Sequence, residues 1–535
     1  MLENAIVGWL ESLTEREFDH PLAALLRSQG FTDLHFVHGR GEFGRDFIAK
    51  RIDNGELRQY SLQSKAGDIG VEEFRKSRLQ IDSIRTGGLS HPGFDPSLPR
   101  VAVLATTGRL VGDARLEAQA YKEQYKSELD FDVWDLDRLV ELLVTRPEAA
   151  LGDRQTGPLL RVLGMADAEE LTDVEIERFS RGWIHDDDQL TDPGDALEAA
   201  VLMGKLHEVD RLDLACYTAL DLLRGAAASA SISGQMDDES LATLDIATGL
   251  FATYAEELFE RCTDQLLRPI PFVNIHNEFG FFATYSVRCS RTIELLGLFA
   301  LLLQWSPEHE DKEKADRVTS WLHSFVAAHP GAAHPLSDHY AVSLVPPALV
   351  LGPIDRALTA TWLRSTLIWT ANRYDGELLG LAPVRSEPKE EIGYVLSALE
   401  HVDLPRRRQS YIATILLDLL AALGLEDLYP VARHDLLAVD ALPEFLYVPD
   451  TSAQFIYAGD GIEQEISPPY AEHWPDDADE SVAPHHADTA LRWLERIGRP
   501  WTALACSSVV RDRHDFGLIQ RLLSGDPPAA SNQQN

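Results

Sequence analysis

Three polar side chains lie at the ends of two segments that otherwise have the pattern of β-strands. Asp46 lies at the start of the first segment, residues 45–52, and Gln63 and Lys65 end the second, residues 57–65. The sequence Asp-Asn-Gly-Glu between them is typical of a hairpin, because Asn-Gly adopts positive φ at little cost. Antiparallel pairing through this turn predicts that Asp46 and Lys65 lie side by side.

The geometry of a strand predicts which of these side chains share a face of the sheet. Successive residues point to opposite faces, so Gln63 and Lys65 are expected on one face and Ser64 on the other. We expect Asp46, Gln63 and Lys65 to converge at one end of the sheet. Carboxylate and amide oxygens suit Mg²⁺, which keeps several waters, and a lysine can orient a metal-bound water. This set of residues predicts metal-dependent hydrolysis of a phosphodiester.

Each of these residues has a simpler explanation when it is taken alone. An isolated Asp46 is more often a turn or strand-edge residue, and a Gln-x-Lys triplet occurs by chance in a long chain. Their order across a hairpin favours a nuclease centre over a degenerate nuclease fold that does not cleave. Arg40 and Arg45 are the candidates for contacts with phosphate, because guanidinium groups match phosphate oxygens.

The elements that must position these residues alternate between helix and strand over the first 145 residues. Residues 15–31 predict a helix with Phe18, Leu22, Leu25 and Leu26 on one face. Further helices are expected at 71–85, 112–128 and 137–145, and strands at 33–39, 45–52, 57–65, 100–107 and 131–136. This order predicts a compact α/β domain.

These motifs resemble the PD-(D/E)XK nuclease superfamily, and within it the Mrr-like restriction endonuclease domain, over residues of about 14–142. "GRGEFGRDFIA" resembles the glycine-rich turn before the family's catalytic aspartate, and "LQSK" resembles a half-motif with Gln in place of Asp or Glu. "VAVLATTGRLVGDAR" and "VWDLDRLVELL" resemble the later strands and the closing helix. The resemblance implies a restriction-endonuclease-like fold with catalytic roles for Asp46, Gln63 and Lys65.

The resemblance also implies a divalent metal, Mg²⁺ with Mn²⁺ as a substitute. Its ligands would be Asp46, Gln63 or a neighbouring backbone oxygen, and an acid of the opening helix. Two residues compete for this last role: alignment on the helix phenylalanine favours Asp19, whereas Glu17 has the longer reach. Pro21 is expected to delay the start of the helix, because proline suits a first turn. The implied substrate is DNA, although the composition does not distinguish DNA from RNA.

The charge of the chain is unevenly distributed. The 535 residues carry a formal net charge of −38. Residues 1–145 contain 18 basic and 24 acidic side chains, whereas the remainder contains 30 and 62. A nucleic-acid contact is therefore compatible with the N-terminal part and disfavoured over most of the remainder.

The length indicates two to four domains. We expect a nuclease domain at residues 1–148, an acidic and mostly helical region of one or two subdomains at 149–525, and a disordered tail at 526–535. Long Leu- and Ala-rich stretches predict the helices of the second region at residues 195–223, 241–267, 292–305, 408–425 and 487–498. No fixed repeat period is found, so an irregular helical architecture is expected.

Two further features bear on the compartment. No run of about 18 apolar residues is present, and the N-terminus lacks the pattern of a signal peptide. The four cysteines, Cys216, Cys262, Cys289 and Cys506, are widely spaced and are expected to be reduced, buried thiols. These features predict a cytoplasmic protein with no membrane partner.

The sequence as a whole predicts a metal-dependent DNA endonuclease whose helical region regulates it. By resemblance, such nucleases act in bacterial defence against phage or plasmids. A protein partner of the helical region and a homo-oligomer are both compatible with this prediction. The alternative is a sensor or scaffold that binds DNA through a degenerate nuclease fold without cutting it.

Overall fold

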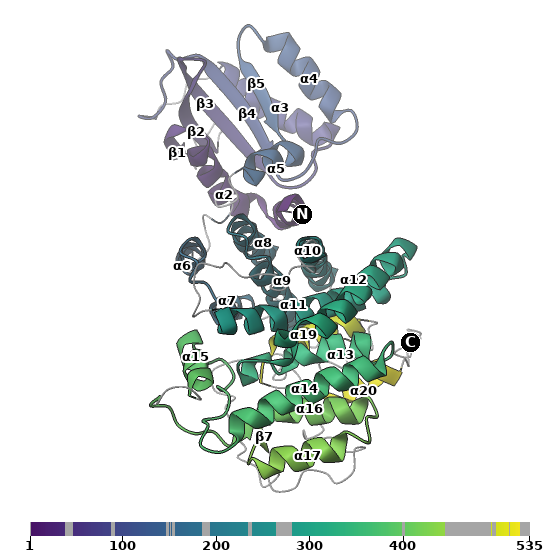
Figure 1. Cartoon of the computed structure of the whole chain (residues 1–535). Helices are drawn as coiled ribbons and strands as arrows, with labels where there is room; N and C mark the ends of the chain where they lie inside the picture. The colour runs from purple at the N-terminus through teal and green to yellow at the C-terminus, as the bar shows by residue number, and fades with distance from the viewer. Residues whose placement is uncertain are drawn as a thin grey trace. The chain divides into compact units, whose positions relative to one another are not determined.

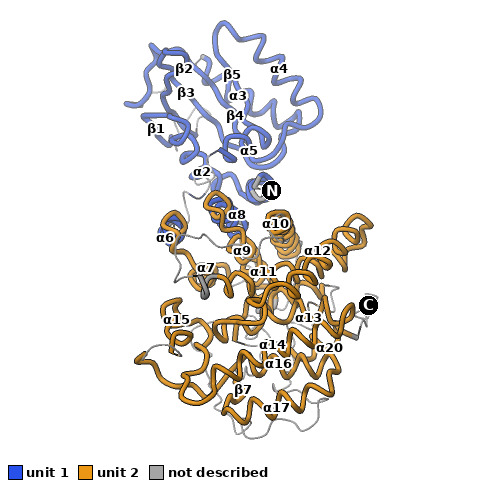
Figure 2. Tube along the Cα trace, viewed as in Figure 1, with its two compact units in different colours: residues 1–165, 192–205 blue, residues 166–191, 206–535 orange. Residues whose placement is uncertain are grey.

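The chain forms two compact units, which are residues 1–165 with 192–205 and residues 166–191 with 206–535 (Figure 2). The computed structural model describes residues 2–37, 46–86, 91–145, 149, 151, 156–184, 193–233, 238–263, 281–397, 402–444, 494, 499–512 and 514–524. The first unit extends beyond the boundary that we expected at residue 148, and it includes residues 192–205. The second unit is one compact body, and the expected tail at 526–535 lies outside the described residues.

The first unit contains a five-stranded sheet with helices packed against it (Figure 1). Its elements are α1 (Leu2–Ser12), α2 (Glu15–Ser28), β1 (Thr32–Phe36), β2 (Phe47–Asp53), β3 (Glu56–Lys65), α3 (Val71–Thr86), β4 (Arg100–Thr106), α4 (Ala114–Tyr125), β5 (Asp130–Trp134) and α5 (Leu136–Val144). Most of α6 (Thr156–Asp167) and α8 (Pro193–Glu208) also belongs to this unit. The order of elements confirms the predicted α/β domain.

The strands lie in the sheet in the order of the sequence, from β1 to β5. β1, β2 and β3 pair antiparallel, whereas β4 and β5 run parallel to β3. The two parallel connections pass through α3 and α4, as parallel pairing requires a crossover. The carboxyl end of β3 and the amino end of β2 therefore meet at one end of the sheet.

The hairpin between β2 and β3 forms at the predicted turn. Asn54 and Gly55 both have positive φ, of 52° and 83°. Two successive residues with positive φ match the twist of antiparallel strands. The turn fixes the register from Asp53 opposite Glu56 to Phe47 opposite Leu62, and this register brings Asp46 to the level of the last residues of β3.

Helix α2 begins earlier than Pro21 led us to expect. Thr14 and Glu17 form a reciprocal capping box at its N-terminus, which stabilises a start at Glu15. Pro21 lies inside the helix, so the expected delay was wrong: the capping box sets the first turn before the proline is reached. Phe18 and Leu22 are buried on the predicted face.

The second unit is mainly helical, as predicted, and α9 packs against α10 in its core (Figure 1). Its helices are α7 (Asp173–Ser180), α9 (Leu212–Ser233), α10 (Asp238–Thr263), α11 (Phe281–Gln304), α12 (His309–Ala328), α13 (Val345–Leu351), α14 (Arg356–Tyr374), α15 (Pro388–Leu396), α16 (Tyr411–Ala422), α17 (Tyr429–Ala438), α19 (Pro500–Val509) and α20 (Phe516–Ser524). Two-residue strands β6 (Gln409–Ser410) and β7 (Leu442–Pro443) pair in parallel.

The predicted stretch 195–223 is interrupted between α8 and α9, where Asp210 has a positive φ of 59°. The predicted helix at 487–498 lies outside the described residues except for Leu494. The four cysteines are buried and free of disulfides, as expected. None of the described helices combines the length and the apolar character that a membrane span requires.

Candidate active site

Asp46 lies one residue before β2 and closes the hydrogen-bond ladder between β2 and β3. Its amide donates to the carbonyl of Leu62 at 2.9 Å. Its Oδ2 accepts the backbone N–H of Ser64 at 2.7 Å and lies 3.3 Å from the Ser64 hydroxyl. The Ser64 amide would bond to a backbone carbonyl if β2 were longer, and here it bonds to the Asp46 carboxylate instead. These bonds hold the carboxylate of Asp46 at this end of the sheet.

Asp19, on helix α2, also lies close to the Ser64 hydroxyl. The Oγ of Ser64 lies 2.8 Å from Asp19 Oδ1, and the Asp19 residue is only 8% exposed. Two carboxylates from separate elements thus lie within 3.3 Å of one hydroxyl oxygen. The structure brings Asp19 and Asp46 together around Ser64.

The other candidate for the helix acid, Glu17, has a different position. Its carboxylate accepts the Thr14 amide at 2.9 Å and the Thr14 hydroxyl at 2.7 Å, which completes the capping box. A residue at this capping position stabilises the helix start. The geometry therefore favours Asp19 over Glu17 as the acid that α2 supplies to the sheet end.

Lys65 reaches the same helix. Its Nζ lies 2.8 Å from Glu15 Oε1, and the carboxylate side chain of this pair is 50% exposed. Glu15 and Asp19 are four residues apart on α2 and therefore share a face of the helix, about 6 Å apart along the axis. Lys65 is thus paired with a residue that lies one helical turn before Asp19 on α2. An ion pair this exposed contributes only about 0–1 kcal/mol to stability, so Lys65 can exchange its partner.

Gln63 is not part of this group, which differs from the expected convergence. In register it lies opposite Leu104 of β4, and Leu104 packs with Phe74 and Ile81 of α3. Its Nε2 donates to Oε1 of Gln80, also on α3. Because neighbouring strand residues alternate between faces, the bond of Ser64 to α2 and the bond of Gln63 to α3 place the two side chains on opposite faces.

The expectation that Ser64 would point away from the carboxylate of Asp46 was therefore wrong. The reason lies just before β2, where Asp46 bonds to the amide and hydroxyl of Ser64 rather than continuing the regular pairing opposite Gln63. The Oε1 of Gln63 is buried and accepts no hydrogen bond in the described part of the chain. The side-chain amide of Gln63 is therefore directed to α3 and not to Asp46.

The donor set around Ser64 suits a divalent cation. A hydroxyl has a single hydrogen to donate, so Ser64 can satisfy Asp19 or Asp46 with its Oγ but not both at once. Two carboxylates this close repel each other, and a cation between them relieves the repulsion. The described residues contain no group of three His, Cys, Asp or Glu side chains arranged for a metal. A metal here would take two carboxylates together with backbone and water oxygens, which is the ligand set that Mg²⁺ accepts.

One further sequence prediction and two threonines concern the neighbourhood of the site. Arg40 and Arg45, the candidates for phosphate contacts, lie outside the described residues. The threonines that end β4 are structural: Thr106 donates to the carbonyl of Gly67 at 2.7 Å, and the Thr107 hydroxyl accepts the Gly67 amide at 2.9 Å. These bonds tie the loop after Lys65 to the end of β4.

The candidate acids and the lysine lie at one end of the sheet in an α/β domain. Residues 10–143 match the family model of the Mrr catalytic domain, described as a restriction endonuclease. The predicted resemblance of the N-terminal domain is thereby confirmed, and the match does not extend into the second unit. No curated protein and no solved structure matches the chain.

Sequence reasoning missed Ser64 and Glu15. Ser64 was assigned to the opposite face because strict alternation was extended to Asp46, one residue before the regular strand. Glu15 carried a usable signal, since it lies four residues before Asp19 and such residues share a helix face. Its pairing with Lys65 depends on how α2 packs against β3, which the sequence pattern does not contain.

Proposed function

We propose that the first unit hydrolyses phosphodiester bonds of DNA with the help of a divalent metal, Mg²⁺ or Mn²⁺. The match of residues 10–143 to the restriction endonuclease model supports a nuclease, and DNA is the substrate that this class implies. The observation that carries the proposal is that Asp19 and Asp46 both lie close to the Ser64 hydroxyl, while the next residue, Lys65, is paired with Glu15 on the same helix as Asp19.

Each residue has a separate role in this proposal. Asp46 and Asp19 hold the metal, together with a backbone oxygen next to Gln63. The metal supplies charge stabilisation for the phosphate and lowers the pKa of a water. Lys65 leaves Glu15 to orient the attacking water or to offset phosphate charge. Glu17 and the side chain of Gln63 hold α2 and α3 in place and take no part in binding the metal.

A plasmid assay tests the proposal directly. The full chain is incubated with supercoiled plasmid and Mg²⁺ or Mn²⁺, and with EDTA as the metal-free control. Nicked or linear DNA is expected with the metals and is not expected with EDTA. Equal cutting in EDTA would contradict the metal requirement.

A protein that binds DNA without cutting it is the second candidate, and one observation favours it. The Gln63 side chain lies on the face of α3 instead of beside Asp46, so one expected metal ligand is absent from the group. Uncut plasmid that nevertheless binds the full chain in a gel-shift experiment, with either metal present, would support this candidate over the nuclease.

We further propose that the acidic second unit restrains the nuclease and that the protein acts in defence against foreign DNA. The excess of acidic side chains after residue 145 repels DNA at low ionic strength. A chain that ends after Glu208 keeps every residue of the first unit, and it should cut faster than the full chain at low salt. Cells that carry the wild-type gene should resist phage better than cells that carry Asp46→Ala, and equal resistance would contradict the defence role.

A further inference from the structure

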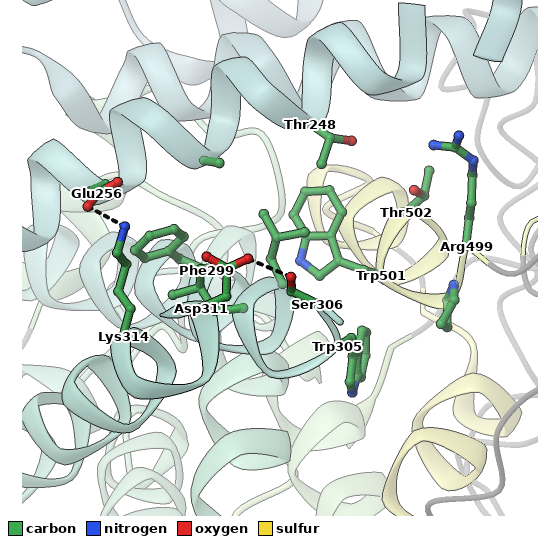
Figure 3. A pocket seen from close by; sticks show the side chains of 14 residues that line it. Thr248, Glu256, Phe299, Trp305, Ser306, Asp311, Lys314, Arg499, Trp501 and Thr502 are labelled. Carbon is green, nitrogen blue, oxygen red and sulfur yellow. Dashed lines mark hydrogen bonds and ion pairs between the residues drawn. The ribbon is translucent and has the colours of Figure 1, made fainter. Parts of the chain in front are cut away.

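The second unit contains a cavity of about 450 Å³ (Figure 3). Three consecutive helices and one distant helix form its walls: α10, the end of α11, the start of α12 and the start of α19. Its volume lies in the range of about 300–1,000 Å³ that is usual for small-molecule sites. A larger hollow of about 680 Å³ is lined by residues of α10 and α12 alone, so it is a groove between two helices.

Aromatic side chains provide much of the apolar wall of the cavity. Phe299 and Trp501 are 1% and 5% exposed, and the Trp501 indole donates to the Leu298 carbonyl at 2.8 Å. Trp305, which follows α11, is different because it is 38% exposed. An indole left this open offers a flat surface on which an aromatic ring can stack.

The charged side chains of the cavity are already paired. Lys314 lies 2.5 Å from Glu256, and Arg499 lies 2.8 Å from Asp245 (Figure 3 labels Lys314, Glu256 and Arg499). Asp311 accepts the Ser306 hydroxyl at 2.5 Å. The lining contains two basic and two acidic side chains, Lys314 and Arg499 against Glu256 and Asp311.

This balance of charge disfavours an ionic ligand. A ligand anion would have to separate Lys314 or Arg499 from its carboxylate, inside a region with 62 acidic and 30 basic side chains. A ligand cation could reach Glu256 only by displacing Lys314, which leaves Asp311 as the acidic side chain of the lining outside the two ion pairs. An uncharged ligand can form hydrogen bonds with the hydroxyls of Ser306 and Thr502 without breaking an ion pair.

We propose that this cavity binds an uncharged, planar heteroaromatic molecule with the size and chemistry of a nucleobase or nucleoside. Such a molecule stacks on Trp305 through its flat face and offers donors and acceptors around its edge to the hydroxyls and ion pairs of the wall. The site lies wholly within the second unit, so it does not depend on the proposed nuclease function.

Calorimetric titration of the full chain tests this site. The probes are adenosine, guanosine, cytidine and thymidine, each compared with its 5′-monophosphate. At least one nucleoside should bind saturably below about 1 mM, and its monophosphate should bind more weakly because of its charge. The absence of nucleoside binding, or tighter binding of the monophosphates, would overturn the proposal.

Two variants place the binding in this cavity. Trp305→Ala removes the stacking surface and should weaken binding about 5- to 150-fold. Ala252→Phe keeps the indole but fills the cavity from α10, and it should abolish binding while the helical circular dichroism is retained. Ile368→Ala removes an exposed side chain of α14 outside the cavity and should leave the affinity unchanged. Binding that survives in a folded Ala252→Phe variant would show that the ligand lies elsewhere.

Discussion

Carboxylates are buried in both units, but their partners differ. In the second unit, Glu294 is fully buried, and both of its oxygens lie 2.9 Å from the Arg511 guanidinium. In the first unit, Asp19 and Asp46 approach a single neutral hydroxyl, that of Ser64. The Arg511 guanidinium matches the charge of Glu294, whereas the Ser64 hydroxyl brings two carboxylates together, and a cation between two such carboxylates relieves their repulsion.

Asp213 illustrates the first arrangement. Burial alone would raise its pKa, but the guanidinium groups of Arg211 and Arg291 outweigh burial and lower the pKa to about 2. Asp173 follows the same pattern, because Arg291 and His339 hold its pKa well below the usual value in spite of burial. We expect the arginine-paired acids of the second unit, such as Asp213 and Glu294, to contribute to its stability, and we propose that Asp19 and Asp46 contribute to chemistry. The predictions below test this division.

The largest effect is expected at Asp46 and Lys65. Asp46→Ala and Lys65→Ala should each lower plasmid cleavage by about 1,000-fold or more, because a bound metal contributes several kcal/mol to the transition state. Unfolding by urea should change little. Lys76→Ala, at an exposed position on α3, is the matched control and should cut normally. Cleavage that persists in both site variants would refute the assignment of the site.

At Arg511 we expect substitution to lower the stability of the chain, which the substitutions at Asp46 and Lys65 should leave almost unchanged. Arg511→Met leaves Glu294 buried without its partner and should lower the free energy of unfolding by about 3–5 kcal/mol, measured by urea denaturation. Replacing both residues by Met should restore much of this loss, because no unpaired charge then remains buried. A single variant as stable as the wild type would show that the buried pair is not structural.

Asp19 and Glu17 lie on the same helix, but we expect substitution of Asp19 to affect cleavage and substitution of Glu17 to affect stability. Asp19→Ala should lower cleavage about 10- to 100-fold through weaker metal binding. Glu17→Ala removes half of the capping box and should cost about 0.5–2 kcal/mol of stability, with the cleavage rate retained. Cleavage rates and urea midpoints of both variants are compared in parallel, and the reverse pattern would make Glu17 the helix acid.

The smallest effect is expected from pH. Because the pKa of Asp213 is lower in the folded chain, at about 2, than its usual 3.8, the folded state binds this proton less readily than the unfolded state. Its contribution to stability is present above about pH 4 and is lost as the pH falls toward 2. Urea denaturation at several pH values should show a shallower loss in Asp213→Asn. An equally steep loss in the variant would contradict the pairing of Asp213.

The sequence was sufficient for the architecture of the first unit. The Asn-Gly turn determines the β2–β3 register, and the apolar spacing of Phe18 and Leu22 defines the buried face of α2. Local signals of this kind act over a few residues, so they can be recognised without knowledge of the tertiary structure.

The arrangement of the site was only partly predictable. The choice between Glu17 and Asp19 depended on which acid caps the helix, and the position of the Asp46 carboxylate beside Ser64 depended on an irregular pairing just before β2. One buried ion pair of the second unit, Glu294 with Arg511, joins residues 217 positions apart. No local pattern specifies such a pair, because it arises only when distant helices pack together.

Binding of Mn²⁺ tests the central claim most directly. Electron paramagnetic resonance can measure free Mn²⁺ as it is added to the full-length wild type, to Asp46→Ala and to Lys76→Ala. The account predicts that the wild type and Lys76→Ala bind one more tightly held Mn²⁺ per chain than Asp46→Ala does, because Asp46 and Asp19 together hold the ion. Identical binding curves for the wild type and Asp46→Ala would contradict a metal site at this end of the sheet.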